Sequence, residues 1–501
     1  MTTRIAAKLI PTDFVNVPSL NWLDALSLSA VDSPTLSSGA TVFTVSPEQL
    51  VPAAAGLSAE IVAAAGFEGK ANETLVIPRE GQPHLVLVGT GPAEELTAAL
   101  LRDVAAAAAR AASKSAELSV TVTERGGLSS AEAARVVAEG VVLARYRYNE
   151  LVTAPKDVPL TTLQIAVAGT PAAEIAAAVA HAEYGVRATC VTRDLANHPP
   201  GHLTATNLAD AIVDLGKRFG FGVEVFDKDQ LIELGCGGLL GVNLGSVEEP
   251  RMVKLSWDGG SARHLGLVGK GIMYDSGGIN LKPSDAMHLL MRMDMAGAAA
   301  IVGMFTAVRD AGVDAKLTAW LMCTDNMPSG SSYKMGDVLT ARNGKTVEVR
   351  NTDAEGRLAM MDGLALAVEE GVDAIIDIAT LTGSALMALG ELTAALIGND
   401  AAMIERVEVA AKLTNEQVWN MPLEKKYRKF LNSNVADLGN VGGKYAGMTT
   451  AGLFLEEFVG GLPWAHLDIA GTMCTDADDS WRSAGATGFG ARLLLELAEA
   501  F

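Results

Sequence analysis

Carboxylates and a guanidinium alternate with small residues in N-T-D-A-E-G-R-L, residues 351–358. Side chains two residues apart emerge on one face of an extended backbone, so we expect Asp353, Glu355 and Arg357 to converge. Two like charges beside a cation indicate a polyvalent partner such as a pair of divalent metal ions, with the arginine holding a further anion. By itself the segment also fits a solvated charged strand, because charged residues are mostly exposed.

A second cluster lies in V-G-K-G-I-M-Y-D-S-G-G-I-N-L-K-P, residues 268–283. Lys270 ends an apolar run, 264–268, that is typical of a buried strand. Asp275 follows in a glycine-rich turn, and Lys282 lies beyond Gly277 and Gly278, which permit backbone turns that other residues resist.

A third carboxylate, Asp294, opens the small apolar run M-A-G-A-A-A, residues 295–300, which predicts a buried helix. An aspartate there also suits a helix N-terminus, where it complements the helix dipole. The three clusters together favour a metal site.

These motifs resemble the leucine (cytosol) aminopeptidase family of two-metal exopeptidases. The segments that carry the resemblance are N-T-D-A-E-G-R-L and V-G-K-G-I-x-x-D-S-G-G, with D-L-A-N-H-P-P-G from Asp194, A-T-L-T-G from Ala379, S-N-V-A-D-L from Ser433 and P-W-A-H-L-D-I-A-G from Pro463.

The resemblance implies two divalent ions per subunit, Mn²⁺, Zn²⁺ or Mg²⁺. It assigns five metal ligands: Lys270, Asp275, Asp294, Asp353 and Glu355. Lys282 and Arg357 match the two catalytic positions, with bicarbonate at Arg357 as the general base. The pocket for the first substrate side chain is expected to contain Met291, Thr380, Leu381, Gly383, Ala470 and Met473.

The expected reaction is hydrolysis of the N-terminal peptide bond of peptides by a metal-activated water, with a preference for Leu and similar apolar residues. One ion would bind the free α-amine, which an internal peptide bond lacks. Two alternatives are a two-metal phosphoesterase and a catalytically silent assembly protein. The ligand lysine and the lack of a histidine-rich shell oppose the first, and intact Lys282 and Arg357 oppose the second.

Composition agrees with a compact globular protein: 501 residues, 49% hydrophobic, 20% charged and net charge −20. The acidic charge disfavours nucleic acid and anionic membranes as partners. The four cysteines show no C-x-x-C spacing, and the first residues lack the apolar core of a signal peptide, so we expect a cytoplasmic protein. The longest apolar stretch, 295–308, is shorter than the roughly 20 residues that span a bilayer. The family resemblance implies a homohexamer.

Alternating elements predict an α/β fold with two domains. Residues 1–170 mix short strands (74–78, 84–89) with helices (94–112, 130–146), and the resemblance implies a macro-like domain there. Residues 171–197 predict a linker helix, and 198–501 a catalytic metallopeptidase domain. Its apolar strands (265–268, 317–323, 374–378) indicate a mixed or parallel central sheet covered by helices such as 358–369, with ligands at the strands' carboxyl ends. Asp362 departs from the family pattern and predicts altered packing behind the site.

Overall fold

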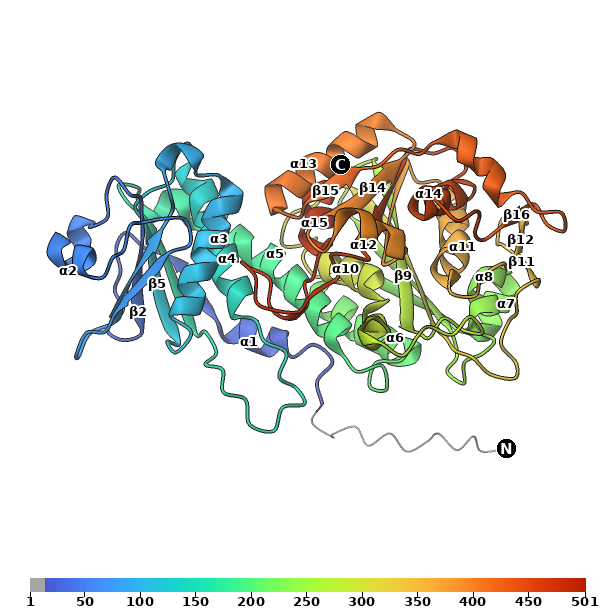
Figure 1. Cartoon of the computed structure of the whole chain (residues 1–501), viewed down its shortest axis with the longest axis horizontal. Coiled ribbons are helices and arrows are strands. Elements are labelled where there is room, and N and C mark those ends of the chain that lie inside the picture. The colour runs from blue at the N-terminus through green and yellow to red at the C-terminus, as the bar shows by residue number, and fades with distance from the viewer. Residues whose placement is uncertain (1–13) are drawn as a thin grey trace. The chain divides into compact units, whose positions relative to one another are not determined.

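The computed structural model describes residues 14–501. The prediction that the first residues form no signal peptide therefore concerns a segment outside the described residues. The chain divides into two compact units (Figure 1). One contains Pro18–Cys190 and Thr475–Gly485, and the other contains residues 14–17, Val191–Cys474 and Ala486–Phe501. The division falls inside α5 (Ala172–Asn197), which is one continuous helix. The domain limits 1–170, 171–197 and 198–501 therefore stay a prediction.

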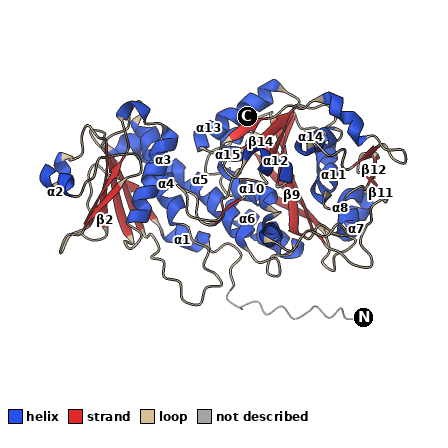
Figure 2. Cartoon of the chain, viewed as in Figure 1, coloured by secondary structure: helices blue, strands red, loops and turns tan. Residues whose placement is uncertain are grey.

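The first unit has a six-stranded sheet of order β1-β6-β5-β2-β4-β3 (Figure 2). The β3–β4 pair is antiparallel, and the other neighbouring strands are parallel. Its elements are α1 (Ser19–Ala25), β1 (Ser27–Ala30), β2 (Ala40–Val45), η1 (Ala53–Ala55), α2 (Ala59–Ala64), β3 (Thr74–Ile77), β4 (His84–Gly89), η2 (Ala93–Glu95), α3 (Ala98–Ala111), β5 (Glu117–Val122), α4 (Ser130–Arg145) and β6 (Thr162–Val167).

The helix predicted over 94–112 is two elements, because Thr97 starts a new helix. Its side chain accepts a hydrogen bond from the backbone N–H of Leu100 (3.2 Å) and so caps α3. An N-cap residue satisfies one of the free N–H groups of a first turn. The short turn η2 precedes this cap as a separate element.

The second unit has an eight-stranded sheet of order β15-β14-β17-β13-β9-β10-β8-β7 and a small sheet β11-β12-β16. In the two-stranded pair β18-β19, Cys474 and Ala486 belong to the second unit, and Thr475 and Gly485 belong to the first. Parallel and antiparallel pairs both occur, so the predicted mixed sheet is confirmed. Helices α6, α10, α13 and α15 lie on one side of β9 in Figure 1, and α8, α11 and α14 on the other. The α/β class predicted for both halves is confirmed.

The helices of this unit after α5 are α6 (Ala205–Phe219), α7 (Lys228–Leu234), α8 (Gly237–Asn243), α9 (Ala286–Leu290), η3 (Met291–Met293), α10 (Ala296–Phe305), α11 (Glu355–Glu370), α12 (Gly383–Leu389), α13 (Ala401–Thr414), η4 (Lys425–Leu431), α14 (Gly447–Glu456) and α15 (Ala491–Glu499). The strands are β7 (Gly222–Phe226), β8 (Arg251–Asp258), β9 (His264–Asp275), β10 (Lys316–Asn326), β11 (Val338–Thr340), β12 (Thr346–Glu348), β13 (Ala374–Ala379), β14 (Ala394–Gly398), β15 (Val418–Asn420), β16 (Leu438–Gly439), β17 (Trp464–Asp468), β18 (Cys474–Thr475) and β19 (Gly485–Ala486).

Strands β10, β9, β13 and β17 are neighbours and run parallel. Their apolar side chains are buried on both faces, which explains the near-continuous apolar runs in the sequence. The carboxyl ends of parallel strands meet at one edge of a sheet, which is where ligands gather in such folds. We therefore expect a ligand site at the carboxyl ends of β10, β9, β13 and β17.

One helical stretch, Ala286–Phe305, is long and apolar enough to cross a membrane by length and composition. However, 78% of its apolar window is buried inside the protein. Side chains that already pack in the protein core leave little apolar surface for lipid, so the stretch has the character of a core helix. It is the one such stretch within residues 14–501.

Asp362 on α11 caps a neighbouring helix rather than changing apolar packing alone. Its carboxylate accepts backbone N–H groups of Gly238 (2.9 Å) and Leu239 (3.0 Å) at the start of α8, and of Arg342 (2.8 Å). The side chain is fully buried. This acceptor ties α8 to the helix that begins at the predicted metal ligand Glu355.

Asp362→Ala is expected to lower the unfolding free energy by about 3 kcal/mol or more, because buried donors left without an acceptor each cost about 1–3 kcal/mol. Urea denaturation measures the change. Glu369→Ala is the control on the same helix, since Glu369 pairs with Arg342 at the surface and such pairs contribute about 0–1 kcal/mol. An Asp362→Ala effect no larger than the control would contradict the capping role.

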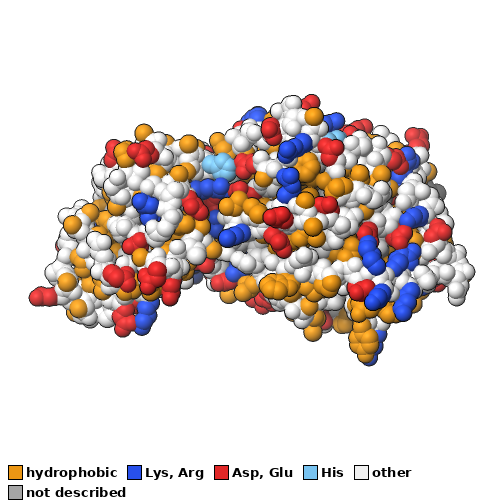
Figure 3. All heavy atoms as spheres, turned by 90° about the horizontal axis from the view of Figure 1, so that it is seen from above, with side chains coloured by type: hydrophobic (Ala, Val, Ile, Leu, Met, Phe, Trp, Pro, Cys, Tyr) orange, Lys and Arg blue, Asp and Glu red, His pale blue; other side chains and the backbone are white. Residues whose placement is uncertain are grey.

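Acidic and basic side chains are interspersed over the face drawn in Figure 3. Acidic residues outnumber basic ones along the whole chain, 59 to 39. A net negative charge of this size repels polyanions at low salt.

Candidate metal centre

Lys270 and Asp275 lie on β9 and reach one cavity although they are five positions apart. An odd separation points side chains to opposite faces of a regular strand. The pairing of β9 with β10 shifts register between Thr324 and Asp325, so that β9 contains one extra residue. Such a bulge re-aims the side chains beyond it. The prediction that the strand ends at Val268 is wrong, since β9 continues to Asp275.

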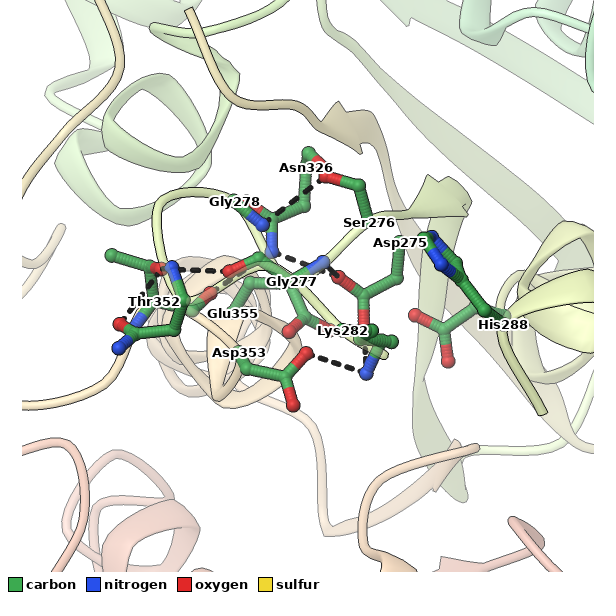
Figure 4. A network of polar contacts seen from close by, with 12 residues as sticks. Asp275, Ser276, Gly277, Gly278, Lys282, His288, Asn326, Thr352, Asp353 and Glu355 are labelled. Carbon is green, nitrogen blue, oxygen red and sulfur yellow. Dashed lines mark hydrogen bonds and ion pairs between the residues drawn. The ribbon is translucent and has the colours of Figure 1, made fainter. Parts of the chain in front are cut away.

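The predicted glycine turn after β9 brings Lys282 back against two carboxylates (Figure 4). Its Nζ lies 2.8 Å from Asp275 Oδ2 and 2.5 Å from Asp353 Oδ1. Gly277 has φ +86°, and a Cβ there would lie 2.9 Å from Asp353 Oδ1. Glycine is therefore required by both backbone conformation and space.

Asp294 follows the turn η3 and precedes the buried helix α10, as predicted. Its Oδ1 accepts hydrogen bonds from Lys270 Nζ (2.8 Å) and Thr380 Oγ1 (2.6 Å). Lys270 Nζ also donates to the Thr380 carbonyl (2.8 Å) and lies 2.9 Å from Glu355 Oε1. Lys270 therefore connects carboxylates from two separate segments.

The extended conformation predicted for residues 353–357 is wrong, because α11 begins at Glu355. Asp353 lies in the turn just before the helix, and Glu355 is in its first turn, where the helix dipole favours a negative charge. Residues two apart on a helix point in different directions. Asp353 and Glu355 line the cavity, whereas Arg357 donates its Nη1 to the Asn440 carbonyl (2.8 Å) and is not among the lining residues.

The cavity at the carboxyl ends of the parallel strands has a volume of about 200 Å³. It brings together twelve of the thirteen predicted site residues, all except Arg357: Lys270, Asp275, Lys282, Met291, Asp294, Asp353, Glu355, Thr380, Leu381, Gly383, Ala470 and Met473. One oxygen of each of Asp275, Asp353 and Glu355 lies within 4.8 Å of the others. This placement does not test the role assigned to each residue.

Sequence reasoning missed three residues that line the same cavity, namely Met287, Thr382 and Leu386. Met287 precedes Met291 by four residues, and Leu386 follows Gly383 by three. This helical spacing was the signal that could have found them.

Asp468, in the motif P-W-A-H-L-D-I-A-G, organises the cavity wall. Its Oδ1 accepts the backbone N–H groups of Leu381 (3.1 Å) and Thr382 (3.3 Å), and its Oδ2 accepts the Thr382 hydroxyl (2.6 Å). Asp468 ends β17 and is buried. It therefore holds the loop between β13 and α12, on which Leu381 lies and which leads into α12 at Gly383.

Four carboxyl groups meet two ammonium groups at this site, so negative charge is in excess. Burial, and after it the charge of Glu355, raise the pKa of Asp275 to about 6 although Lys282 and Lys270 act to lower it. Burial also raises the pKa of Asp294 well above its usual value, against the pull of Lys270. For Glu355 burial acts upward, but Lys270 and Lys282 outweigh it and lower the pKa.

Three carboxylate oxygens of this cluster are buried without a hydrogen-bond partner among residues 14–501. Asp353 Oδ1 lies 2.5 Å from the Lys282 ammonium, and the other two are Asp294 Oδ2 and Glu355 Oε2. Buried polar atoms are nearly always partnered, so an orphan requires an explanation. Excess negative charge and orphaned hard oxygens at the edge of a mixed α/β sheet are typical of metal-dependent hydrolases.

Two family models match the chain, the cytosol aminopeptidase family N-terminal domain over residues 30–155 and the catalytic domain of the same family over residues 190–495. The chain therefore belongs to the cytosol aminopeptidase family, and the resemblance read from its motifs is confirmed. Aminopeptidase activity and dependence on metal fit this family.

The sequences of relatives align with this chain over most of their length. A probable cytosol aminopeptidase of Alkaliphilus metalliredigens is 39% identical over 456 residues, covering 89% of this chain and 91% of the relative. One of Chlorobaculum tepidum is 42% identical over 379 residues, covering 73% and 75%. Among solved structures, the bottromycin maturation enzyme BotP in complex with Mn is 37% identical with a TM-score of 0.85, covering 93% of this chain and 99% of that one. A mutant of tomato leucine aminopeptidase is 29% identical with a TM-score of 0.86, covering 95% and 97%.

Proposed function

We propose that this protein is a two-metal aminopeptidase that releases N-terminal residues from peptides and prefers Leu and similar apolar residues. The observation that carries the proposal is the pair of buried, partnerless oxygens, Asp294 Oδ2 and Glu355 Oε2, at an acidic cavity. Leaving such oxygens without a partner costs about 1–3 kcal/mol each or more. Cations at this position would remove that cost, and family membership supports the same assignment.

The residues present fit a pair of divalent ions. The proposed ligands are Asp275, Asp294, Asp353, Glu355 and the Lys270 amine. Carboxylates are hard ligands that suit Mn²⁺, Zn²⁺ and Mg²⁺, and the solved structure of the relative BotP with Mn supports manganese among these. When bound, such ions polarise a carbonyl and activate water.

Lys270 must change protonation state to serve as a ligand. Burial lowers its pKa, but the charges of Asp294, Glu355 and Asp275 outweigh burial and raise it, so the amine is cationic in this structure. A lysine amine binds metal in its neutral form, so metal loading at Lys270 releases a proton.

Lys282 stays cationic and supplies a fixed positive charge on the cavity wall. Burial lowers its pKa, but Asp275 and Glu355 outweigh burial and raise it. We assign it the stabilisation of negative charge that develops on the scissile carbonyl oxygen, an effect worth several kcal/mol when the donor is preorganised.

Arg357 is proposed to seat bicarbonate as the general base. Burial lowers the pKa of Arg357 to about 10, with Glu355 and Asp468 opposing the shift, so the guanidinium is charged at neutral pH. Its Nε is buried without a hydrogen-bond partner in the described part of the chain. A buried cationic N–H without an acceptor favours a small anion.

The apolar wall of the cavity supports the proposed preference for Leu and Met. Met291, Met473 and Ala470 lie there with Met287 and Leu386. Methionine adapts its shape to irregular apolar groups. Thr380, Leu381 and Gly383 complete the proposed pocket, and the family resemblance implies that the Leu381 carbonyl lies near the substrate amine.

A cytoplasmic location and a homohexamer complete the proposal. The location is supported by the names of the relatives, and the hexamer rests on the family resemblance. Sedimentation of the purified protein measures its mass, and a monomer would contradict the assembly without affecting the reaction.

The purified protein with Mn²⁺ is expected to hydrolyse leucine p-nitroanilide and to lose this activity with EDTA. N-acetyl-leucine p-nitroanilide should be cleaved with a kcat/KM lower by on the order of 10⁴-fold, because a site built to bind a substrate amine rejects an analogue without it. Equal cleavage of both substrates would show that the amine is not recognised. Turnover of p-nitrophenyl phosphate in place of the anilide would favour a phosphoesterase.

A further inference from the structure

Three of the proposed ligands lie at two loops that are distant in sequence. Asp275 ends β9, where one loop begins, and Asp353 and Glu355 lie where the other loop meets the start of α11. Figure 4 shows these loops joined by polar contacts. Asp275, Asp353 and Glu355 present oxygens within 4.8 Å of one another. Like charges repel at this distance, so the two loops must be held in place by other contacts.

The side-chain amide of Asn326, at the end of β10, connects the two loops. Its Nδ2 donates to Asp275 Oδ1 (2.8 Å) and to the backbone carbonyl of Thr352 (2.9 Å). Both partners are acceptors, so the NH₂ group must face them. Asn326 pairs with Asp275 in the strand register, beyond the bulge that redirects β9.

The oxygen of the Asn326 amide faces the backbone of Gly278. Asn326 Oδ1 has no hydrogen-bond partner in the part of the chain that the structure describes. A Cβ on Gly278, whose φ is +64°, would lie only 2.7 Å from this oxygen. The amide is fully buried and held between Gly278 and its two acceptors.

Thr352 adds a second link between the same loops. Its hydroxyl donates to the Gly277 carbonyl (2.7 Å), and its backbone N–H donates to Asn280 Oδ1 (2.8 Å). The Thr352 carbonyl that accepts from Asn326 also accepts from the Tyr333 hydroxyl (2.7 Å). The Thr352 carbonyl that Asn326 contacts is therefore also held in place by Tyr333.

We propose that Asn326 is a positioning residue for the metal centre, whose amide orients the carboxylate of Asp275 and ties it to the loop that carries Asp353 and Glu355. The inference rests on the proposed function and extends it to a residue outside the ligand set. Groups that hydrogen-bond to metal ligands fix their orientation, and their loss typically weakens metal binding by about 10- to 100-fold.

Two substitutions separate hydrogen bonding from packing. Asn326→Leu keeps the branched shape and removes both donors, whereas Asn326→Ala removes the donors and the volume. Mn²⁺ affinity is measured on the full-length protein without substrate, from the electron paramagnetic resonance signal of free Mn²⁺. Both variants are expected to bind Mn²⁺ about 10- to 100-fold more weakly than the parent.

The matched control is Asn243→Leu. Asn243 is also a buried asparagine, and its Nδ2 donates to the Glu248 carbonyl (2.8 Å) and to Thr324 Oγ1 (3.0 Å), neither of them a proposed ligand. We expect this variant to lose thermal stability like Asn326→Leu while its Mn²⁺ affinity stays within about threefold of the parent. A purely structural role for Asn326 predicts the same small change in affinity for both leucine variants.

Each outcome decides a different claim. If Asn326→Ala weakens Mn²⁺ binding and Asn326→Leu does not, the loss comes from the missing side-chain volume, and the positioning role is overturned. Unchanged Mn²⁺ affinity in both variants also overturns it. A parent protein that binds Mn²⁺ but cleaves no leucine anilide refutes the proposed reaction, while the variants still decide the role of Asn326. A parent that binds no Mn²⁺ refutes both.

Discussion

Glu355→Gln is expected to weaken Mn²⁺ binding by more than about 100-fold, since even residues that only hydrogen-bond to ligands contribute up to about that factor. The change removes the charge that pairs with Lys270 at 2.9 Å and replaces the partnerless Glu355 Oε2 or its neighbour with an NH₂ group. The same substitution should abolish cleavage of leucine p-nitroanilide, because metal and activity depend on the same carboxylate.

Isothermal titration with Mn²⁺ and elemental analysis of the purified protein measure this loss. Glu369→Gln is the matched control, because Glu369 lies on the same helix but pairs with Arg342 at the surface. A Glu355→Gln variant that retains the parent's metal content and affinity would remove Glu355 from the proposed ligand set. The control must keep both metal and activity.

The side chains of the site could be predicted from sequence because short motifs contain them. Asp275 and Lys282 flank a glycine pair, and Asp353 and Glu355 lie two residues apart, so their proximity requires little knowledge of the fold. The structure brings both pairs to one cavity. Their roles as ligands and catalytic group stay a prediction.

The backbone that carries these side chains could not be predicted in the same way. Strand β9 is buried on both faces, so its apolar run has no period of two that would reveal the bulge before Asp275. The alternation of Asp353, Glu355 and Arg357 mimics a strand, but the residues that follow pack as the buried helix α11, and tertiary burial decides the conformation. Asn326 was missed because its partners are distant in sequence.

Residues 475–485 show the same limit at the level of the domain. They lie in the predicted 198–501 range, which stays a prediction, and they cluster with Pro18–Cys190 in one compact unit although they are distant from it in sequence. Arg110 donates to the carbonyls of Ser480 (2.8 Å) and Arg482 (2.6 Å). Such long-range bonds carry no local signal in composition or periodicity.

Lys282→Met is expected to separate catalysis from metal binding. Methionine keeps much of the length of the side chain and removes its charge, so kcat should fall by about 10²- to 10³-fold, the usual cost of losing one preorganised oxyanion donor. Mn²⁺ affinity should stay equal or rise, because Asp275 and Asp353 lose a competing cation that contacts both. KM should change little, since an interaction made only in the transition state affects kcat and not ground-state binding.

Steady-state kinetics at saturating Mn²⁺, together with a Mn²⁺ titration of the same preparation, measure both quantities. Lys282→Arg is the companion variant, because it keeps the positive charge and should retain more activity than Lys282→Met. If Lys282→Met loses metal and activity in parallel, the ammonium serves to hold Asp275 and Asp353 in place, and the charge that stabilises the reacting carbonyl must come from another group.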